Sequence, residues 1–343
     1  MNASVAPSRL ASVIVPVHNG AHTLDACLSA LLAQTEGRND IEIIIVDDGS
    51  SDDSAHVAEQ RGVTVLRQKH AGAGAARNRG ARRATGAILL FTDADCEPLP
   101  DWIEQMLVPF SDPEVVGVKG IYRTRQRSPV ARFAQAEYEE KYDRLAQGDS
   151  IDFVDTYAAA YRRTLFERHG GFDPSFLLDE DQELSFRLAE AGHKLVLAPA
   201  AAVYHQHPGT LVGYARRKAR LGRWKVRVHA RHPAKAFQDS YTPWTQKAQL
   251  VLLALALAGI VAAACGLVTW AAPAIVALLG LLTTGPLLTK AWRQGWLIVL
   301  LTPPLAAVRA LALDLGLAWG LICQIVEKVG NLSWMYNSKG EKK

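Results

Sequence analysis

Three groups of carboxylates follow one another along the chain, each where an apolar strand is expected to end or a helix to begin. They are Asp47-Asp48, Asp93-Ala94-Asp95 and Glu180-Asp181. Carboxylates grouped in this way can hold a divalent cation, accept hydrogen bonds from a nucleotide and take up a proton during a reaction. Their order along the chain therefore favours an enzyme that binds a nucleotide with the help of a cation.

The sharpest of the three motifs is Asp93-Ala94-Asp95, which follows the apolar run of residues 89–92. If the strand continues through the motif, both carboxylates project to the same side, because side chains alternate along a strand. Two hard oxygen ligands suit Mg²⁺ or Mn²⁺ bridging a diphosphate, and the cation would stabilise charge on a departing nucleoside diphosphate. A turn that binds nothing is the alternative interpretation.

Two upstream motifs fit a nucleotide. Asp48 precedes Gly49, which permits a sharp turn, and its carboxylate can accept hydrogen bonds from a base or a ribose. An ordinary Asp-Gly turn explains Asp47-Asp48 equally well. Residues 71–80 are mostly small, so phosphates can approach backbone N–H groups and pair with Arg77. The third glycine of a dinucleotide fingerprint is missing there, which counts against a nucleotide-dependent oxidoreductase.

Glu180-Asp181 is expected to open a helix that Asp179 caps and Gly192 ends. Carboxylates in a first helical turn also favour the helix dipole, which is a sufficient structural reason for their presence. Because neighbouring residues differ by about 100° around a helix, Glu180 and Asp181 cannot serve a substrate equally well. The two preceding clusters favour a chemical role for this pair.

The elements that must position these groups alternate upstream of residue 245. Strands are expected at residues 12–17, 41–46, 63–66, 88–92, 115–119 and 194–197, and helices at 23–34, 52–60 and 72–84. Repeated strand–helix–strand units predict an α/β fold of the Rossmann-like kind, with a mostly parallel sheet flanked by helices. Ligands bind such sheets beyond the carboxyl ends of the strands, where the first two acidic clusters fall.

Downstream of residue 245 the chain becomes strongly apolar. Residues 248–270, 271–289 and 297–326 form three apolar runs, and the first can cross a hydrocarbon core of about 30 Å. Pro303-Pro304, Arg309 and Asp314 interrupt the third, which either spans or lies in the interface. Basic residues in the flanking loops predict a multi-pass protein of the inner (cytoplasmic) membrane with its catalytic domain in the cytoplasm. A buried helical hairpin of a soluble protein is the alternative.

Length and charge agree with this division. The 343 residues carry a net charge of +4, and they are expected to form a catalytic domain at 1–245, transmembrane or interfacial helices at 246–330 and a polar tail at 331–343. Residues 216–231 contain eight Lys or Arg and no carboxylate. Because this run adjoins the first apolar segment, it favours contact with a membrane over nucleic acid, which we do not expect as a partner. Four scattered cysteines indicate a reduced compartment, and no cleaved signal peptide is indicated.

Taken together, the motifs resemble the family 2 glycosyltransferases, which have a GT-A fold. The motifs that carry the resemblance are Pro16-Val-His-Asn19, Asp47-Asp-Gly-Ser50, Ala76-Arg-Asn78, Asp93-Ala-Asp95, Gly170-Gly-Phe-Asp173 and Glu180-Asp181. The likeness covers about residues 10–230. It implies that Asp48 contacts the nucleobase, that Asp93 and Asp95 bind the sugar nucleotide and its metal, and that Asp181 is the base of a direct, inverting displacement. Pro16, Asn19 and Arg77 are expected on the donor side.

Two further positions follow from the resemblance. Arg220-Leu-Gly-Arg223-Trp224 resembles the Gln-x-x-Arg-Trp motif of processive members, with Arg in place of Gln, so processive and single addition both stay open. With Glu180, these residues are expected near the acceptor or the diphosphate. His205 matches a third metal ligand of some GT-A enzymes, and a structural histidine is an equal alternative; His207 is a weaker candidate.

The predicted activity is transfer of a sugar from a nucleotide-sugar, UDP favoured over GDP, to a lipid or envelope-glycan acceptor at the membrane, with Mg²⁺ or Mn²⁺ as cofactor. A non-catalytic membrane scaffold with a degenerate transferase domain is one alternative, against which the intact Asp95 and Asp181 argue. A nucleotide-dependent oxidoreductase is the other.

Overall fold

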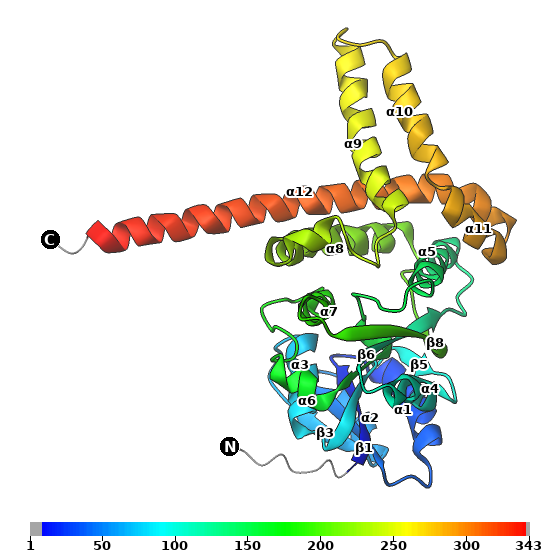
Figure 1. Cartoon of the computed structure of the whole chain (residues 1–343), viewed down its shortest axis with the longest axis vertical. Coiled ribbons are helices and arrows are strands. Elements are labelled where there is room, and N and C mark those ends of the chain that lie inside the picture. Colours follow the sequence, from blue (N-terminus) through cyan, green and yellow to red (C-terminus); the bar gives the residue numbers. More distant parts are fainter. Residues whose placement is uncertain (1–8, 341–343) are drawn as a thin grey trace. The chain divides into compact units, whose positions relative to one another are not determined.

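The computed structural model describes the backbone of residues 9–340 and the side chains of residues 9–326. The chain divides into two compact units, which are described separately (Figure 1). The first comprises Met1–Arg127, Glu137–His207 and Asp239–Tyr241, and the second comprises Ser128–Ala136, Pro208–Gln238 and Thr242–Lys343. Ser128–Ala136 and Pro208–Gln238, which lie upstream of residue 245, thus group with the C-terminal helices. The predicted domain boundary at residue 245 stays a prediction.

The first unit is built on an eight-stranded sheet in the order β3-β2-β1-β4-β7-β6-β8-β5. Its strands are β1 (Arg9–Val17), β2 (Ile41–Asp47), β3 (Thr64–Arg67), β4 (Gly86–Phe91), β5 (Cys96–Pro98), β6 (Val115–Arg123), β7 (Ala159–Arg162) and β8 (Lys194–His205). β3, β2, β1 and β4 pair in parallel, as do β6 and β8, whereas β7 and β5 pair antiparallel with their neighbours. The predicted α/β fold with a largely parallel sheet is therefore confirmed.

Helices cover both faces of this sheet (Figure 1). They are α1 (Ala21–Thr35), α2 (Ser54–Gln60), α3 (Ala73–Arg83), α4 (Trp102–Leu107), α6 (Arg163–Arg168), α7 (Glu180–Glu190) and the later part of α5 (Pro129–Leu145), with the 3-10 turns η1 (Val108–Ser111) and η2 (Thr156–Ala158). Along β1, Val13 and Val15 join the core beneath α1 and α4, while Ile14 joins the core beneath α3 and α7. Burial on both faces is why these strands read as continuous apolar runs.

The second unit contains α8 (Leu211–Arg231), η3 (Pro233–Ala236), α9 (Trp244–Ala264), α10 (Ala271–Leu282), α11 (Gly285–Gln294) and α12 (Trp296–Gly340). α9 and the Trp296–Val326 part of α12 are long and apolar enough to cross a membrane, and α10 with α11 would count as a third span, bent by 51°. The second predicted apolar segment is thus two helices, whereas the third is one helix that continues through Pro303-Pro304. The predicted polar tail lies partly outside the described residues.

Candidate functional site

A cleft of about 590 Å³ opens in the first unit where β1, β2 and β4 end. Its lining includes Pro16, Asn19, Asp48, Arg77, Asp93 and Asp95, together with His18, His70, Leu177 and Gln206. The cleft therefore brings together every residue that was predicted to contact the donor. It lies at the carboxyl ends of parallel strands, as expected for this class of sheet.

Asp48 organises the wall of the cleft between β3 and α3. One of its carboxylate oxygens accepts hydrogen bonds from Ala71 N–H at 2.8 Å and from the Gln68 amide at 2.7 Å, and the other accepts one from Gly72 N–H at 2.9 Å. The side chain is 4% exposed. Asp47, by contrast, accepts the N–H of Ser50 and closes the Asp-Gly turn. The two adjacent aspartates thus hold different loops.

Asn19 fixes the turn after β1 in a conformation that few residues adopt. Its φ is +52°, in the left-handed region that asparagine tolerates better than most side chains. Its N–H donates to the Ser50 hydroxyl, and its side-chain oxygen accepts the N–H of Ser51. The first two motifs are therefore joined directly across the top of β1 and β2.

Two histidines at this wall of the cleft were not predicted. The rings of His18 and His70 lie 4.2 Å apart at an angle of 33°, and His18 Nδ1 is 2.9 Å from the backbone oxygen of Asp48. His70 Nδ1 lies 3.0 Å from the Asp48 carboxylate, and its side chain is 62% exposed. Although the rings are tilted, the exposed pair offers a surface on which a nucleobase can stack. No local pattern predicts this contact, because His18 and His70 lie on separate loops.

Asp95 and His205 meet because of one strand pairing. β5 runs antiparallel to β8, and this register places Cys96 opposite His205. As a result Asp95 Oδ1 lies 3.7 Å from His205 Nδ1, and the ligand atoms of Asp95, Cys96 and His205 all lie within 4.8 Å of one another. The carboxylate is a ligand that suits Mn²⁺ or Mg²⁺, whereas the imidazole is a ligand for a transition metal, so the pair fits Mn²⁺ better than Mg²⁺. Burial raises the pKa of the Cys96 thiol, so this soft ligand stays protonated and is a poor third ligand.

Asp93 and Asp95 share the cleft, but not for the predicted reason. β4 ends at Phe91, and residues 93–96 form a turn closed by the Cys96 N–H donating to the backbone oxygen of Asp93. The alternation of a strand therefore does not apply to the motif. Asp95 faces His205, whereas Asp93 Oδ1 is 2.6 Å from the Arg77 guanidinium.

Arg77 joins the second and third acidic clusters. Its guanidinium also lies 2.6 Å from Glu180 Oε1, and the side chain is 4% exposed. Arg77 was predicted to pair with phosphates, and Glu180 to lie at the acceptor or diphosphate. The structure gives both residues an internal partner, and their ligand contacts stay predictions.

Asp181 starts α7 with its two oxygens held by backbone groups. One accepts the N–H of Thr156 at 3.2 Å and the other accepts the N–H of Gln182 at 2.8 Å. Withdrawal from water, with the charges of Glu180 and Asp179, raises the pKa of Asp181 well above the usual range of an aspartate. A carboxylate with a raised pKa is a stronger base than an ordinary aspartate.

Asp179 differs from the expectation that its side chain caps α7. It occupies the N-cap position with a φ of +61° and makes no capping hydrogen bond through its side chain. Asn78 instead holds the approach to the helix, since its amide donates to the backbone oxygen of Phe172 and its oxygen accepts the Phe172 N–H. The Gly170-Gly-Phe motif is thereby fixed to α3. At Gly171 an added Cβ would lie 2.5 Å from the Asn78 oxygen, so only glycine fits.

A buried ion pair behind Asp181 was also missed by the sequence. Lys119 of β6 pairs with Asp155, and their side chains are 0% and 4% exposed. The Lys119 ammonium lies 5.1 Å from the centre of the Phe153 ring and 5.4 Å from that of Tyr241. Burial lowers the pKa of Lys119, and Asp155 opposes that shift. Because Asp155 precedes Thr156, this pair fixes the backbone that holds Asp181.

Arg220, Arg223 and Trp224 lie on α8, in the second unit, so no position relative to the cleft is assigned to them. The Arg227 guanidinium lies over the Trp224 ring at 5.7 Å. His207 was the weaker metal candidate. Its ring stacks on Tyr138, with ring centres 5.4 Å apart, and its backbone N–H donates to Gln126, which gives it a structural role.

The arrangement is that of a nucleotide-sugar transferase domain, and comparison with known proteins identifies the family. Residues 12–170 match the family described as Glycosyl transferase family 2. This part of the chain is a family 2 glycosyltransferase domain, as the sequence motifs predicted.

Relatives and solved structures agree with the assignment. The chain is 31% identical over 236 residues to the pre-mycofactocin glycosyltransferase of Mycobacterium tuberculosis, covering 65% of this chain and 48% of that protein. It is 29% identical over 228 residues to glycosyltransferase AglE of Haloferax volcanii, covering 63% and 73%. The chain thus spans about half the length of the mycobacterial relative.

Among solved structures, the mannosyltransferase PcManGT from Pyrobaculum calidifontis, in complex with GDP-Man and Mn²⁺, superposes with a TM-score of 0.58. The sequence identity is 21%, and the match covers 93% of this chain and 90% of that one. At this identity the likeness is one of fold, and it confirms the GT-A type.

Proposed function

We propose that this chain is an inverting glycosyltransferase that moves a sugar from a nucleoside diphosphate to a lipid or glycan acceptor at the membrane. The observation that carries the proposal is the convergence of Asp48, Asp93 and Asp95 on one cleft, with the buried His205 next to Asp95. Asp181 lies beside the same network with a raised pKa. Arg77 connects the two sides of this arrangement.

The donor would lie along the cleft from the histidine pair to Asp95. His18 and His70 offer a stacking surface for the base, and Gly72, whose φ is +92°, presents its backbone where a phosphate can approach closely. Asp95 and His205 would hold Mg²⁺ or Mn²⁺, and the bound cation would supply positive charge to stabilise the leaving diphosphate. The neighbour with GDP-Man and Mn²⁺ supports this class of donor.

In the reaction, the acceptor hydroxyl oxygen forms a bond to the anomeric carbon while the bond from that carbon to the diphosphate oxygen breaks. The electron pair of the broken bond leaves with the nucleoside diphosphate, and the hydroxyl proton passes to the Asp181 carboxylate. The Thr156 and Gln182 N–H groups hold that carboxylate in place. Because the acceptor oxygen attacks the face opposite the leaving diphosphate, the anomeric configuration is inverted.

We further propose that the second unit attaches the protein to the inner membrane with the catalytic domain in the cytoplasm. The candidate spans in α9 and α12 and the basic residues of α8 support this placement. Attachment favours an acceptor that is itself held at the membrane, such as a polyprenyl phosphate.

A panel of UDP- and GDP-sugars, each with and without Mn²⁺, tests the donor proposal. We expect cation-dependent binding of one sugar nucleotide and its loss in Asp95→Ala. A UDP-sugar remains the predicted donor, and GDP-mannose is the most informative alternative donor in the panel. Donor hydrolysis or transfer separates an enzyme from a scaffold; no binding to any donor, with the chain folded, would overturn the proposal.

A further inference from the structure

The α12 helix packs along α8, which carries eight Lys or Arg residues between Arg216 and Arg231. Their backbones touch closely: a Cβ added to Gly316 would lie 2.1 Å from the Ala219 oxygen, and one added to Gly320 would lie 2.6 Å from the Arg223 oxygen. Higher positions on one helix contact higher positions on the other, so the two helices run parallel. α12 and the basic helix must therefore share one environment along this length.

The opposite side of α12 is exposed and apolar. Exposed residues recur every three or four positions, as they do on one face of a helix, at Leu300, Pro304, Ala307, Leu311, Leu315, Trp319 and Ile322. Between Leu300 and Leu315 the other positions are buried or half-buried. Exposure is therefore confined to one face as far as Leu315, whereas from Ala318 onward adjacent positions such as Leu321 and Ile322 are both exposed.

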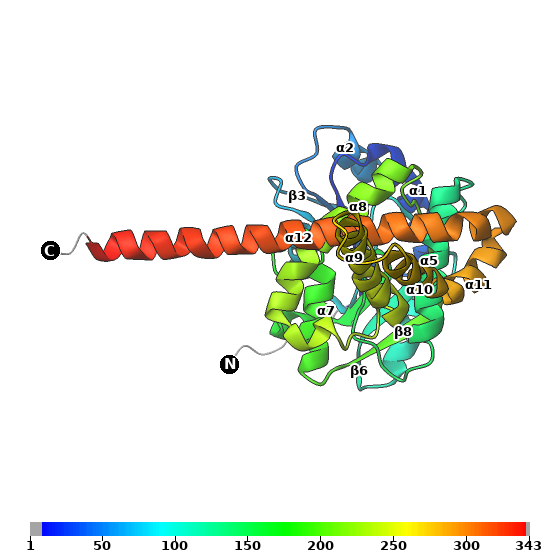
Figure 2. The same ribbon diagram turned by 90° about the horizontal axis from the view of Figure 1, so that it is seen from above.

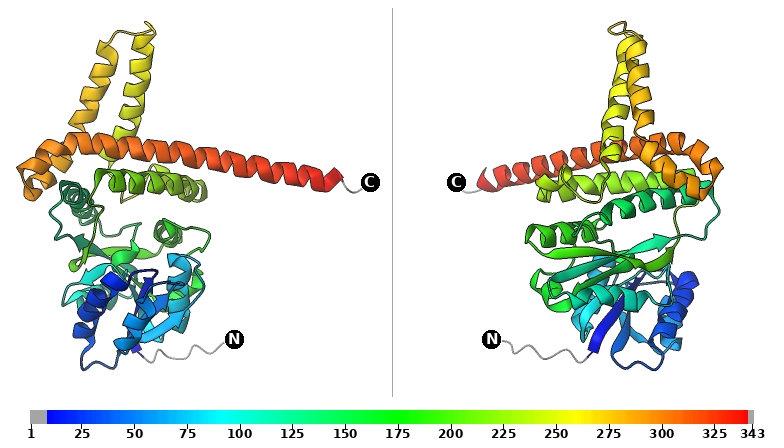
Figure 3. Two further views of the ribbon diagram at one scale, coloured as in Figure 1. Left: turned by 180° about the vertical axis from the view of Figure 1, so that it is seen from behind. Right: turned by 45° about the vertical axis from the view of Figure 1, so that its right-hand side comes forward.

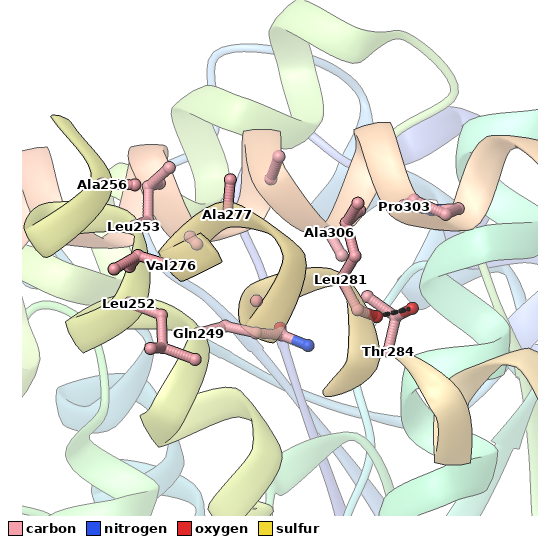
Figure 4. A pocket seen from close by; sticks show the side chains of 13 residues that line it. Gln249, Leu252, Leu253, Ala256, Val276, Ala277, Leu281, Thr284, Pro303 and Ala306 are labelled. Atoms are coloured by element: carbon pink, nitrogen blue, oxygen red, sulfur yellow. Dashed lines mark hydrogen bonds between the residues drawn. The ribbon is translucent and has the colours of Figure 1, made fainter. Parts of the chain in front are cut away.

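The α9–α10 hairpin rises from α12 on the side opposite α8 (Figures 1 and 3). α12 crosses the base of the hairpin, since the Arg309 guanidinium in mid-helix is 2.5 Å from Gln249 Oε1, in the second turn of α9. An apolar pocket of about 230 Å³ marks the same crossing (Figure 4). It is lined by residues 249–256, 276–284 and 303–310. Seen from above, α12 extends well away from this point (Figure 2).

We propose that α12 lies in the plane of the membrane interface, with its apolar stripe in the bilayer, and does not span it. If α12 crossed the membrane, α8 would be carried with it and its cations would enter the hydrocarbon core, where each is costly. Lying flat, α12 buries its stripe about 5–10 Å deep while α8 faces anionic headgroups. The α9–α10 hairpin is then the part that enters the core.

This inference rests on the membrane attachment proposed above and not on the reaction. It is tested by the depth of nitroxide labels in the full chain, reconstituted into vesicles of phosphatidylethanolamine and phosphatidylglycerol. Single cysteines replace Leu300, Leu315 and Ile322, each exposed by more than half. The native Cys265 and Cys323 are changed to Ala, and Cys27 and Cys96 are buried and stay. Two control variants report on the hairpin. One carries Leu255→Cys in the same background, and the other keeps the native Cys265 as its labelled cysteine.

We expect the three α12 labels to lie at one shallow depth, although positions 300 and 322 are separated by about 33 Å along the helix. The two α9 labels should differ in depth by about 15 Å if that helix is inserted. A depth that changes steadily from position 300 to 322, passing through the bilayer centre near position 315, would overturn the proposal for α12 alone. Three labels in water would overturn both this proposal and the membrane attachment.

Discussion

Asp181 occupies a place that is unfavourable for a charged carboxylate and suitable for a base. Glu180 and Asp179 are its neighbours in the chain, Asp155 lies nearby, and the group is withdrawn from water. All of these raise its pKa, and Arg77 opposes the rise without cancelling it. Ionised Asp181, the residue proposed to take the proton, therefore lowers the stability of the folded state.

This cost gives a prediction for stability. A carboxyl group whose pKa is raised on folding favours the folded state at pH below about 4, and the benefit is lost as pH rises through the folded pKa. Asp181→Asn removes this loss, so we expect it to raise the melting temperature at pH 8 more than at pH 5. Each unit of raised pKa corresponds to about 1.4 kcal/mol. Thermal unfolding at both pH values measures the effect, with Asp101→Asn at an exposed position as control. If Asp181→Asn changed the melting temperature equally at pH 5 and pH 8, Asp181 would not have a raised pKa.

The metal ligands can be separated from their neighbour. Asp95→Ala should weaken Mn²⁺ binding at least tenfold, because a hard, charged ligand is lost. Cys96→Ala should leave it within about twofold, since a buried, protonated thiol is a poor ligand for a hard cation. Calorimetric titration of Mn²⁺ in the presence of the nucleoside diphosphate measures both. Loss of binding in Cys96→Ala with Asp95→Ala unaffected would mean that the ligands were assigned wrongly.

The buried Lys119–Asp155 pair should contribute strongly to the stability of the fold, although Lys119 does not line the cleft. Lys119→Met leaves Asp155 buried without its partner and should cost about 3–5 kcal/mol. Lys119→Met with Asp155→Leu should recover much of this loss, because neither buried charge remains. Urea unfolding of the solubilised chain provides the measurement. The solvent-accessible pair Lys194–Asp112 is the control, and Lys194→Met should cost much less than Lys119→Met, because water screens this pair. Equal costs at the two lysines would refute the account.

At the scale of elements, the strands were predictable because they are buried on both faces. Ile14 and Val15 point to different cores, and residues 13–17 of β1 contain no polar side chain. β5 and β7 were missed because they are three and four residues long, and Cys96–Pro98 has no apolar pattern. Yet β5 is the strand that places Asp95 beside His205. The proposed metal site therefore depends on the strand with the weakest sequence signal.

Contacts between distant loops could not be predicted. The His18–His70 pair and the Lys119–Asp155 pair join residues 52 and 36 positions apart, and no local pattern marks either. The motif at Asp93–Asp95 was found from its composition, although the reason given for its geometry was wrong. Residue type suggested the candidate site, whereas the tertiary fold determined which carboxylate meets which partner.

The contact between α8 and α12 gives a prediction at the same scale. Gly316→Val places carbon atoms on the Ala219 backbone and should destabilise the second unit by about 1–3 kcal/mol. Gly285→Ala is the matched control, since an added Cβ meets nothing within 4 Å there. Thermal unfolding in detergent compares the two. A Gly316→Val variant as stable as Gly285→Ala would show that the helices do not touch.

At the scale of the whole molecule, a family 2 transferase domain and a second, largely helical unit with apolar candidate spans are combined in one chain. The proposed function assigns donor binding and proton transfer to the first unit and attachment to the second. The acceptor must then be reached from the membrane side. That division explains why the residues proposed for chemistry lie in the first unit, while the exposed apolar stripe lies in the second.

The central claim is that Asp181, and not its neighbour Glu180, takes the proton of the acceptor. Transfer should be measured in Asp181→Asn and Glu180→Gln with saturating donor and Mn²⁺, alongside donor affinity. We expect Asp181→Asn to bind the donor as the unaltered chain does and to lose transfer by about 10²–10⁴-fold. Glu180→Gln should retain far more activity, because the Glu180 carboxylate forms an ion pair with Arg77 and is not the proton acceptor in this account. Normal transfer by Asp181→Asn, with Glu180→Gln inactive, would contradict the claim.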